Sequence, residues 1–225
     1  MQIFCSHSVG CAGWDMESIF KETEFQTGCR TMRFKDADIG KVKMLDWDYL
    51  EHKKKPDKVK EHHLELVKEH DFDVVMSMDI WNHNIEECFK YTDTLLKYSD
   101  RVLIPVHYYT DRLKNYELAY PNANWFTNNK TIPREYKDNF THVLGGSPQT
   151  QYKLKDDFKN LKSVDGNQIF NVAIRAGKVW YPEKPYWRKP IEFTLTEEIF
   201  RKSVKNLNDL WNKPIKLPLE IGTLK

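Results

Sequence analysis

Long apolar runs are missing from this sequence of 225 residues. No stretch reaches the roughly 18 apolar residues that a membrane-spanning helix needs, so we expect no segment in a membrane. The first residues, MQIFCSHSVG, lack the charged segment and the apolar run of a secretory signal peptide, and we expect none. These absences predict a cytoplasmic protein.

Cysteine and histidine patterns typical of metal sites are also missing. The chain has four cysteines, and none belongs to a CxxC pair. The spacing of Cys5, Cys11 and Cys29 fits no zinc motif, and neither HxH nor HExxH occurs. We therefore expect reduced thiols and no bound metal.

The sequence has neither a strong net charge nor a glycine-rich dinucleotide-binding turn. It carries 35 basic and 33 acidic residues, a net charge of +2, which is too balanced to predict nucleic-acid binding from bulk charge. The segment SHSVGCAG only weakly imitates the glycine pattern of a dinucleotide-binding fold. Binding of a polyanion would therefore need a local cationic patch.

An apolar strand followed by an amphipathic helix is the pattern that recurs along the chain. It predicts strands at residues 3–8, 29–34, 42–47, 73–79, 101–107, 124–128, 141–146 and 162–165. It predicts helices at residues 16–25, 56–70, 84–99, 111–120, 133–139, 154–162 and 196–212. Apolar strands separated by helices are typical of a parallel sheet that is covered on both faces. We expect one α/β domain over residues 1–225, a compact (β/α)8 TIM-like barrel with a C-terminal helix; an open doubly wound sheet is the alternative.

Polar residues or glycines stand at the C-terminal ends of five predicted strands, the edge at which α/β folds build active sites. These residues are Asp46 and Asp48, Asp79, His107, Gly145 and Gly146, and Asp165. Asp46 and Asp48 flank Trp47, so strand alternation predicts that they face the same way and that at least one points into a pocket.

Most of these residues also have a structural explanation. Asp79 could cap the helix that follows it, and Asp165 could belong to an Asp-Gly turn. His107 could be a structural histidine, and Gly145 and Gly146 could simply make a tight turn.

Converging carboxylates without a metal motif favour chemistry at a glycosidic bond. One carboxylate can attack an anomeric carbon as oxocarbenium character develops, and a second carboxyl group can protonate the leaving group. The other polar groups could then bind the base or the sugar by paired hydrogen bonds.

The order of the motifs resembles that of the tRNA-guanine transglycosylase superfamily, including short phage and archaeal relatives that insert 7-deazaguanines into DNA or tRNA. The resemblance covers roughly residues 42–180 and depends on the strings DVVMSMD, LIPVH, HVLGG and SVDGNQ, and on the run VDGNQIFNVAIRAGKVW, which is similar to the DNA-modifying branch. The chain departs from the family pattern at three points. LDWDY has no Ser-Gly-Gly run after the aspartate, a histidine stands where the family usually has glutamine, and the Cys/His zinc site is missing.

The resemblance implies a base-exchange reaction. Asp165 would attack C1′ of a target guanosine, and Asp46 or Asp48 would move the proton. The family's base-reading positions correspond here to Asp79, His107, Gly145 and Gly146. The implied partners are DNA or tRNA and a free 7-deazaguanine base, with no organic cofactor. A second copy of the chain or a partner subunit could supply further nucleic-acid-binding surface.

One segment mixes cations with aromatic residues, as nucleic-acid-binding surfaces often do. It is GKVWYPEKPYWRKP, residues 177–190, and its candidate contacts are Lys178, Trp180, Lys184, Trp187, Arg188 and Lys189. The alternative is an arm that packs over the barrel while its lysines remain in solvent.

Three other functions use the same residues. A nucleoside hydrolase or deoxyribosyltransferase would act on small nucleosides, and a non-catalytic barrel would only bind nucleic acid or a nucleotide. A metal-dependent hydrolase would need a divalent site made from residues such as His7, Asp46, Asp79, His107 and Asp165.

Overall fold

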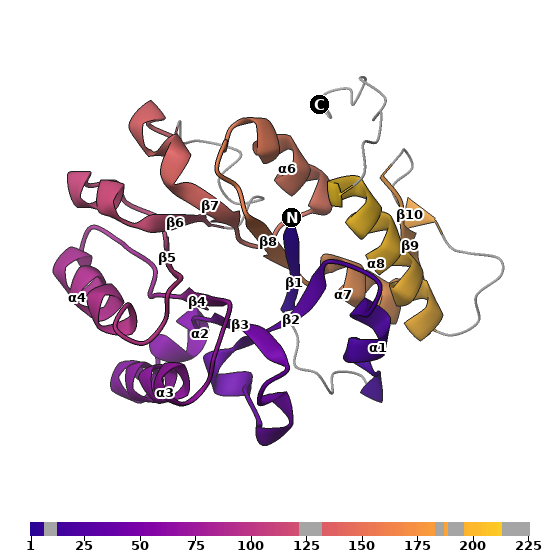
Figure 1. The fold of residues 1–225 in the computed structure, drawn as a ribbon, viewed down its shortest axis with the longest axis horizontal. Helices are drawn as coiled ribbons and strands as arrows, with labels where there is room; N and C mark the ends of the chain where they lie inside the picture. The colour runs from indigo at the N-terminus through magenta and orange to yellow at the C-terminus, as the bar shows by residue number, and fades with distance from the viewer. Residues whose placement is uncertain (7–12, 122–131, 183–186, 189–195, 213–225) are drawn as a thin grey trace.

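The computed structural model describes residues 1–6, 13–121, 132–182, 187–188 and 196–212. In this part of the chain, eight parallel strands close into a barrel in sequence order (Figure 1). The strands are β1 (Gln2–Ser6), β2 (Phe25–Arg30), β3 (Val42–Asp46), β4 (Val74–Met76), β5 (Val102–Pro105), β6 (Glu117–Tyr120), β7 (Phe140–Val143) and β8 (Ser163–Gly166). The predicted (β/α)8 fold is confirmed.

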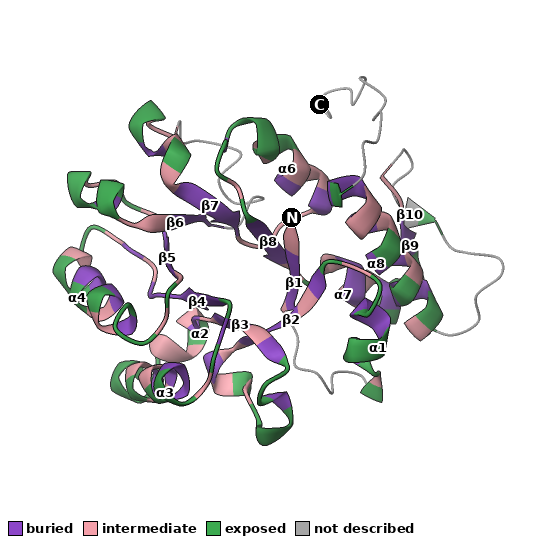
Figure 2. Cartoon of the chain, viewed as in Figure 1, coloured by how far each residue is buried: buried purple, intermediate pink, exposed green. Residues whose placement is uncertain are grey.

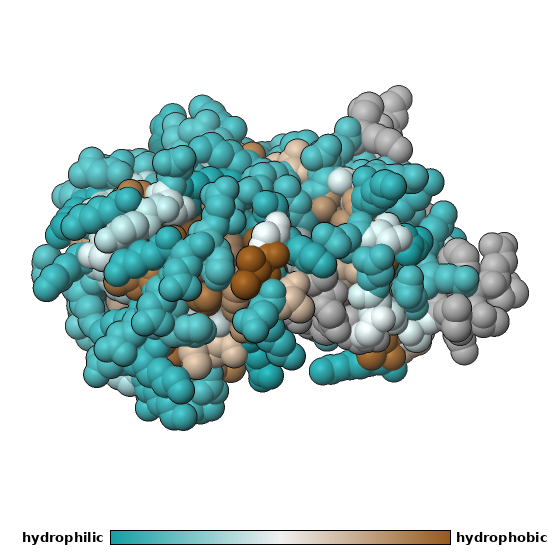
Figure 3. All heavy atoms as spheres, turned by 60° about the horizontal axis from the view of Figure 1, so that its bottom comes forward, coloured by the Kyte–Doolittle hydropathy of each residue, from teal (hydrophilic) through white to brown (hydrophobic). Residues whose placement is uncertain are grey.

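Helices cover the outside of the barrel, with a buried stripe toward the strands and an exposed one toward solvent (Figure 2). The helices are α1 (Met16–Phe20), α2 (Tyr49–His52), α3 (Pro56–Glu69), α4 (Ile85–Leu95), α6 (Pro148–Lys153), α7 (Gln168–Ala176) and α8 (Thr196–Asn212). The rings of Phe20, Phe170 and Phe200 pack together and join α1, α7 and α8 on one side of the barrel. Among the described helices, none is long and apolar enough to cross a membrane. Figure 3 shows hydrophilic residues over most of the visible surface.

The sixth barrel strand lies where the sequence predicted a helix. Residues 111–120 form the 3₁₀ helix η4 (Asp111–Asn115) and then β6, which pairs with β5 and β7. Glu, Leu and Ala favour helix locally. Pairing on both edges and burial of Leu118, Ala119 and Tyr120 outweigh that preference. The predicted strand at 124–128 lies outside the described residues.

The second strand begins earlier than predicted. It runs from Phe25 to Arg30, and the expected strand residues 31–33 form the 3₁₀ helix η2 (Thr31–Arg33). The sequence pattern does not predict the first part of this strand, because the polar string Gln-Thr-Gly has no alternation of apolar residues. Gly28 is a register partner of Met44, and the Met44 methyl group occupies the space that a Cβ at residue 28 would fill.

Several helices are shorter than predicted. The expected helix at 16–25 ends at Phe20 because β2 begins at residue 25, and the one at 84–99 ends at Leu95. Residues 133–139 and 154–162 form only the 3₁₀ helices η5 (Arg134–Asn139) and η6 (Leu154–Asp156). Helices α2, α6 and α7 were not predicted, whereas α8 has the predicted bounds. A further 3₁₀ helix, η3 (Asp36–Asp38), lies between β2 and β3.

Candidate active site

A cavity of 740 Å³ opens at the carboxyl ends of the barrel strands. Its wall contains at least one residue from the end of every strand: Ser6, Arg30, Asp46, Asp79, His107, Pro121, Gly145 and Asp165, in strand order. The cavity therefore brings together Asp46, Asp79 and Asp165, three of the four carboxylates that the sequence singled out. His107 and Gly145 also line it.

Asp165 is buried and held by three donors. Its Oδ2 accepts a hydrogen bond from the Ser6 hydroxyl, and its Oδ1 accepts one from the Gly145 backbone N–H at 2.8 Å. The Oδ1 atom also lies 3.4 Å from Nε2 of His142. Asp165 is the third residue of β8 rather than part of a turn, so the Asp-Gly turn does not explain it.

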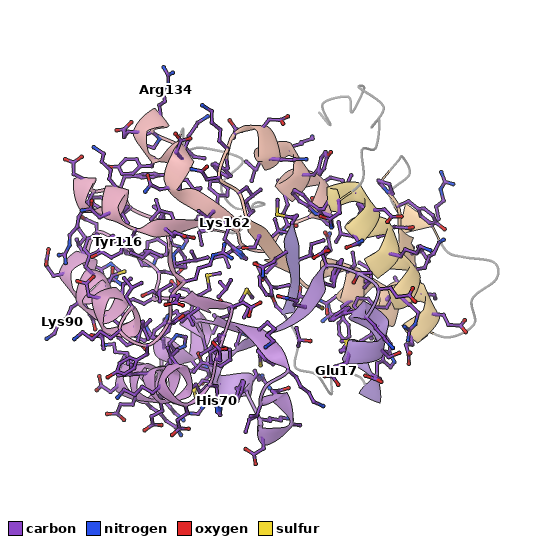
Figure 4. All side chains as sticks on the ribbon, in the orientation of Figure 1. Glu17, His70, Lys90, Tyr116, Arg134 and Lys162 are labelled. Carbon is purple, nitrogen blue, oxygen red and sulfur yellow. The ribbon has the colours of Figure 1, made fainter. Side chains whose placement is uncertain are left out.

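A chain of hydrogen bonds continues from Asp165 through the interior of the barrel. Ser163 Oγ lies 2.8 Å from His142 Nδ1 and accepts a hydrogen bond of 2.9 Å from Arg101 Nη2. The Arg101 guanidinium also pairs with Glu117 at 3.3 Å, and Glu117 pairs with Lys162, which lies over the middle of the barrel in Figure 4. The chain thus extends from the N-terminal end of the barrel to the cavity.

The two ends of this chain fix the tautomer of His142. Arginine can only donate and a carboxylate can only accept, so Ser163 accepts from Arg101 and Asp165 accepts from Nε2–H of His142. Burial lowers the pKa of His142, although its hydrogen bond to Asp165 acts in the opposite direction. The imidazole is therefore neutral, and its Nδ1 accepts a hydrogen bond from the Ser163 hydroxyl.

We expect Ser163→Ala to destabilise the protein by about 1–3 kcal/mol. Ser163 is fully buried, and its loss leaves an Arg101 donor and the His142 acceptor without their partner. Urea unfolding would measure the change. Ser99→Ala is the control, because the Ser99 hydroxyl has no hydrogen-bond partner within the described residues, and we expect about 0.5 kcal/mol or less from it. Equal losses in the two variants would contradict the role of the chain.

Asp79 and His107 form a hydrogen-bonded pair at the cavity wall. Asp79 Oδ1 lies 2.7 Å from Nε2 of His107, and the His107 ring stacks on Trp81 with centroids 4.0 Å apart. Asp79 does not cap the next helix, because α4 begins after Asn84. The second oxygen of Asp79 has no partner among the described residues.

Asp46 has a different environment from the other two aspartates. Its side chain makes no hydrogen bond or ion pair with any described residue, although Arg30 is its register partner on β2. Burial raises the pKa of Asp46 well above its ordinary value, and the nearby Asp165 and Asp79 raise it further. Asp46 therefore holds its proton above the pH at which an exposed aspartate loses it.

Asp48 and Gly146 do not line the cavity, contrary to the expectation that they belong to its site. The strand ends at Asp46, so alternation does not continue to Asp48, whose buried carboxylate caps α2 through the Glu51 N–H at 3.4 Å. Both glycines have positive φ, 51° at Gly145 and 86° at Gly146, which residues with a side chain rarely adopt. The Gly145 N–H is already donated to Asp165.

The aromatic and basic segment does not reach the cavity in the described part of the chain. Trp180 is completely buried, and its backbone bonds to Ser203 and Asn206 of α8, so the prediction that it stacks on bases is wrong. Lys178 and Arg188 are exposed. Lys184, Lys189 and the side chain of Trp187 lie outside the described residues. The backbone of β10 (Trp187–Arg188) pairs antiparallel with β9 (Val179–Trp180).

Thiol and metal chemistry receive little support from the described residues. Burial raises the pKa of the Cys29 thiol, which lines the cavity, to about 12, so it is not a ready nucleophile. Within the described ranges, no three His, Cys, Asp or Glu side chains are grouped closely enough to hold a metal ion. His7, one of the suggested ligands, lies outside these ranges.

Sequence reasoning missed several residues of the site. Ser6 and His142 hold Asp165, and three cations line the cavity: Arg30, Arg33 and Lys35. His142 begins the quoted string HVLGG, but a histidine inside a strand gives no sign of its partners. The cations stand at the end of β2 and just after it, and the sequence placed the end of this strand too late.

The fold and the cavity define a (β/α)8 barrel protein with a charged pocket at the carboxyl ends of its strands. The family model DUF6610, described as a family of unknown function, matches residues 21–212, and the chain belongs to this family. Comparison with curated proteins gives no match.

Proposed function

We propose that the chain is a base-exchange transglycosylase that replaces guanine in DNA or tRNA by a 7-deazaguanine. The observation that carries this proposal is the contrast between two aspartates of one cavity. Asp165 is held by three donors, whereas Asp46 has no described partner and a raised pKa. Cleavage of a glycosidic bond needs such a pair, one carboxylate to attack and one carboxylic acid to protonate the leaving group.

The proposed reaction has two matched halves. An oxygen of Asp165 forms a bond to C1′ of the target guanosine as the C1′–N9 bond breaks. Guanine leaves with the electron pair of that bond and takes the proton of Asp46. A free 7-deazaguanine then attacks C1′ through N9, returns its N9 proton to Asp46 and releases Asp165. The cycle consumes no oxidant, reductant or cofactor.

Asp79 is the proposed reader of the base. A carboxylate accepts hydrogen bonds only, and the edge of guanine carries N–H donors at N1 and at the amino group. The hydrogen bond to His107 and the stacking of His107 on Trp81 hold the Asp79 carboxylate in place. Its second oxygen remains available to accept a hydrogen bond from the base. Gly145, rather than contacting the base through its N–H, would orient Asp165.

A nucleoside hydrolase or deoxyribosyltransferase is the second candidate. It would use the same two aspartates on free nucleosides. The burial of Trp180, and the absence of the described residues Lys178 and Arg188 from the cavity wall, favour this reading over a long polynucleotide track along that segment.

Label exchange distinguishes the two functions. The protein is incubated with radiolabelled guanine or a labelled 7-deazaguanine and, in separate reactions, with duplex DNA, bulk tRNA or free guanosine and deoxyguanosine. We expect label to enter DNA or tRNA. Label entering only the free nucleosides, or hydrolysis of them without exchange, would replace the proposal by the second candidate.

A further inference from the structure

Three cations on one short segment line the cavity beside the proposed site. Arg30 is the last residue of β2, Arg33 is the last residue of η2, and Lys35 follows two residues later. The segment lies on the β2 side of the mouth, between the ends of β1 and β3. β2 is two strands away from β8, which carries Asp165, and from β4, after which Asp79 follows.

These cations have few partners in the protein. Arg33 and Lys35 are exposed, and no described carboxylate forms an ion pair with the guanidinium of Arg33 or the ammonium of Lys35. The Asp38 carboxylate accepts a hydrogen bond from the Lys35 backbone N–H instead. Arg30 makes one long ion pair, 3.9 Å from Asp48, and 41% of its side chain remains exposed. Packing and ion pairing therefore do not explain why all three cations face one cavity.

The charges divide the cavity into two chemically different parts. Asp79 and Asp165 suit an uncharged group with N–H donors and a developing positive charge on a sugar. The cations suit an anion that lies next to that group, because arginine binds phosphate oxygens through paired N–H donors and lysine adds a point charge. A nucleotide unit has this arrangement, with a neutral base, a sugar and a phosphate.

We propose that Arg30, Arg33 and Lys35 form a phosphate subsite that binds the polynucleotide backbone beside the target nucleotide. This inference rests on the proposed function and names how the site would select a polymer over a free nucleoside. Arg30 is the register partner of Asp46, so the bound phosphate would lie close to the residue that protonates the leaving base. Its negative charge would also offset the guanidinium, which acts to lower the pKa of Asp46.

Binding as a function of salt concentration tests the subsite without requiring catalysis. Fluorescein-labelled duplex DNA and tRNA are titrated with protein between about 50 and 200 mM KCl, and anisotropy gives the association constant. The plot of log K against log salt has a negative slope, and each lost phosphate contact on B-DNA makes it shallower by about 0.9. We expect Arg33→Ala/Lys35→Ala to reduce the magnitude of the slope by about 1.8 and the affinity at low salt by tenfold or more.

The matched control is Lys58→Ala/Arg134→Ala, which also removes one lysine and one arginine. Both residues are exposed and outside the cavity wall, on α3 and η5, and Arg134 points away from the barrel in Figure 4. We expect the parental slope from this variant. Equal slopes in the two variants and the parent would overturn the phosphate subsite, as would a parent that binds neither polymer.

Guanosine 5′-monophosphate and inorganic phosphate, used as competitors, identify the source of the phosphate. If both small molecules compete weakly while binding of the polymer depends steeply on salt, the subsite binds the phosphates of the polynucleotide backbone. Competition by the mononucleotide at the same phosphate concentration as unlabelled DNA would overturn it. If Arg33→Ala/Lys35→Ala makes the salt dependence shallower but the parent shows no label exchange, the phosphate subsite is kept and base exchange is rejected. If the parent exchanges label but the salt dependence of this variant is unchanged, base exchange is kept and the phosphate subsite is rejected.

Discussion

Replacing Asp165 by asparagine is expected to abolish base exchange and lower kcat by at least about 10⁴-fold. The amide is a poor nucleophile and cannot form the bond to C1′ on which both halves of the proposed reaction depend. Label exchange into DNA and tRNA, measured at saturating base, gives the ratio of the two rates. Asp71→Asn, an exposed aspartate that precedes β4 at the opposite end of the barrel, is the control and should keep the parental rate.

The fold should survive this substitution because of the way the carboxylate is held. Asparagine can keep its oxygen toward the Gly145 N–H and His142 and turn its amide nitrogen toward Ser6, whose hydroxyl can accept instead of donate. Alanine would leave all three donors without an acceptor. A circular dichroism spectrum and melting curve like those of the parent would show that the lost rate is chemical. Full activity in a folded Asp165→Asn protein would exclude the aspartate nucleophile.

How far the sequence predicts the site depends on where each strand ends. Asp46, Asp79, His107 and Asp165 follow directly from the rule that parallel strands carry functional groups at their carboxyl ends. Asp48 does not, because alternation applies only while the chain remains a strand, and β3 stops at Asp46. Applying strand alternation two residues past the end of β3 therefore assigns to the cavity a side chain that caps a helix.

The interior of the barrel could not be predicted in the same way. Arg101, His142 and Ser163 come from three different segments, and only the closure of the barrel brings β5, β7 and β8 around one axis. In the sequence, Arg101 is the first residue of the strand predicted at 101–107, and nothing there indicates that it donates hydrogen bonds inside the barrel. Closure of the barrel also explains why residues 117–120 form the strand β6. Pairing with β5 and β7 outweighs their local preference for helix. Local patterns thus predicted the class of fold and the acidic residues of the mouth, but neither its cations nor the buried polar contacts.

Asp46→Asn is expected to lower the exchange rate by about 10²–10⁴-fold, the usual range for loss of a general acid. Its effect should also depend on pH. The parental rate should fall as pH rises through the raised pKa of Asp46, because the acid form is lost. The pH–rate profile of the variant should lack this falling limb. In Asp79→Asn the limb should move to lower pH, because the Asp79 charge is one cause of the raised pKa.

Stability gives a second readout that does not need a substrate. The folded protein holds the Asp46 proton at pH values at which the unfolded chain, with a pKa of about 3.9, has lost it. In this pH window the folded protein binds more protons than the unfolded chain. The free energy of unfolding therefore falls as pH rises through the window. Asp46→Asn has no proton to lose, and we expect it to be more stable than the parent above the window and similar to it near pH 4. Urea unfolding at several pH values measures this difference. A variant that is less stable than the parent at pH 8 would mean that Asp46 is ionised and paired in the folded state, and the proton for the leaving base would have to come from another group.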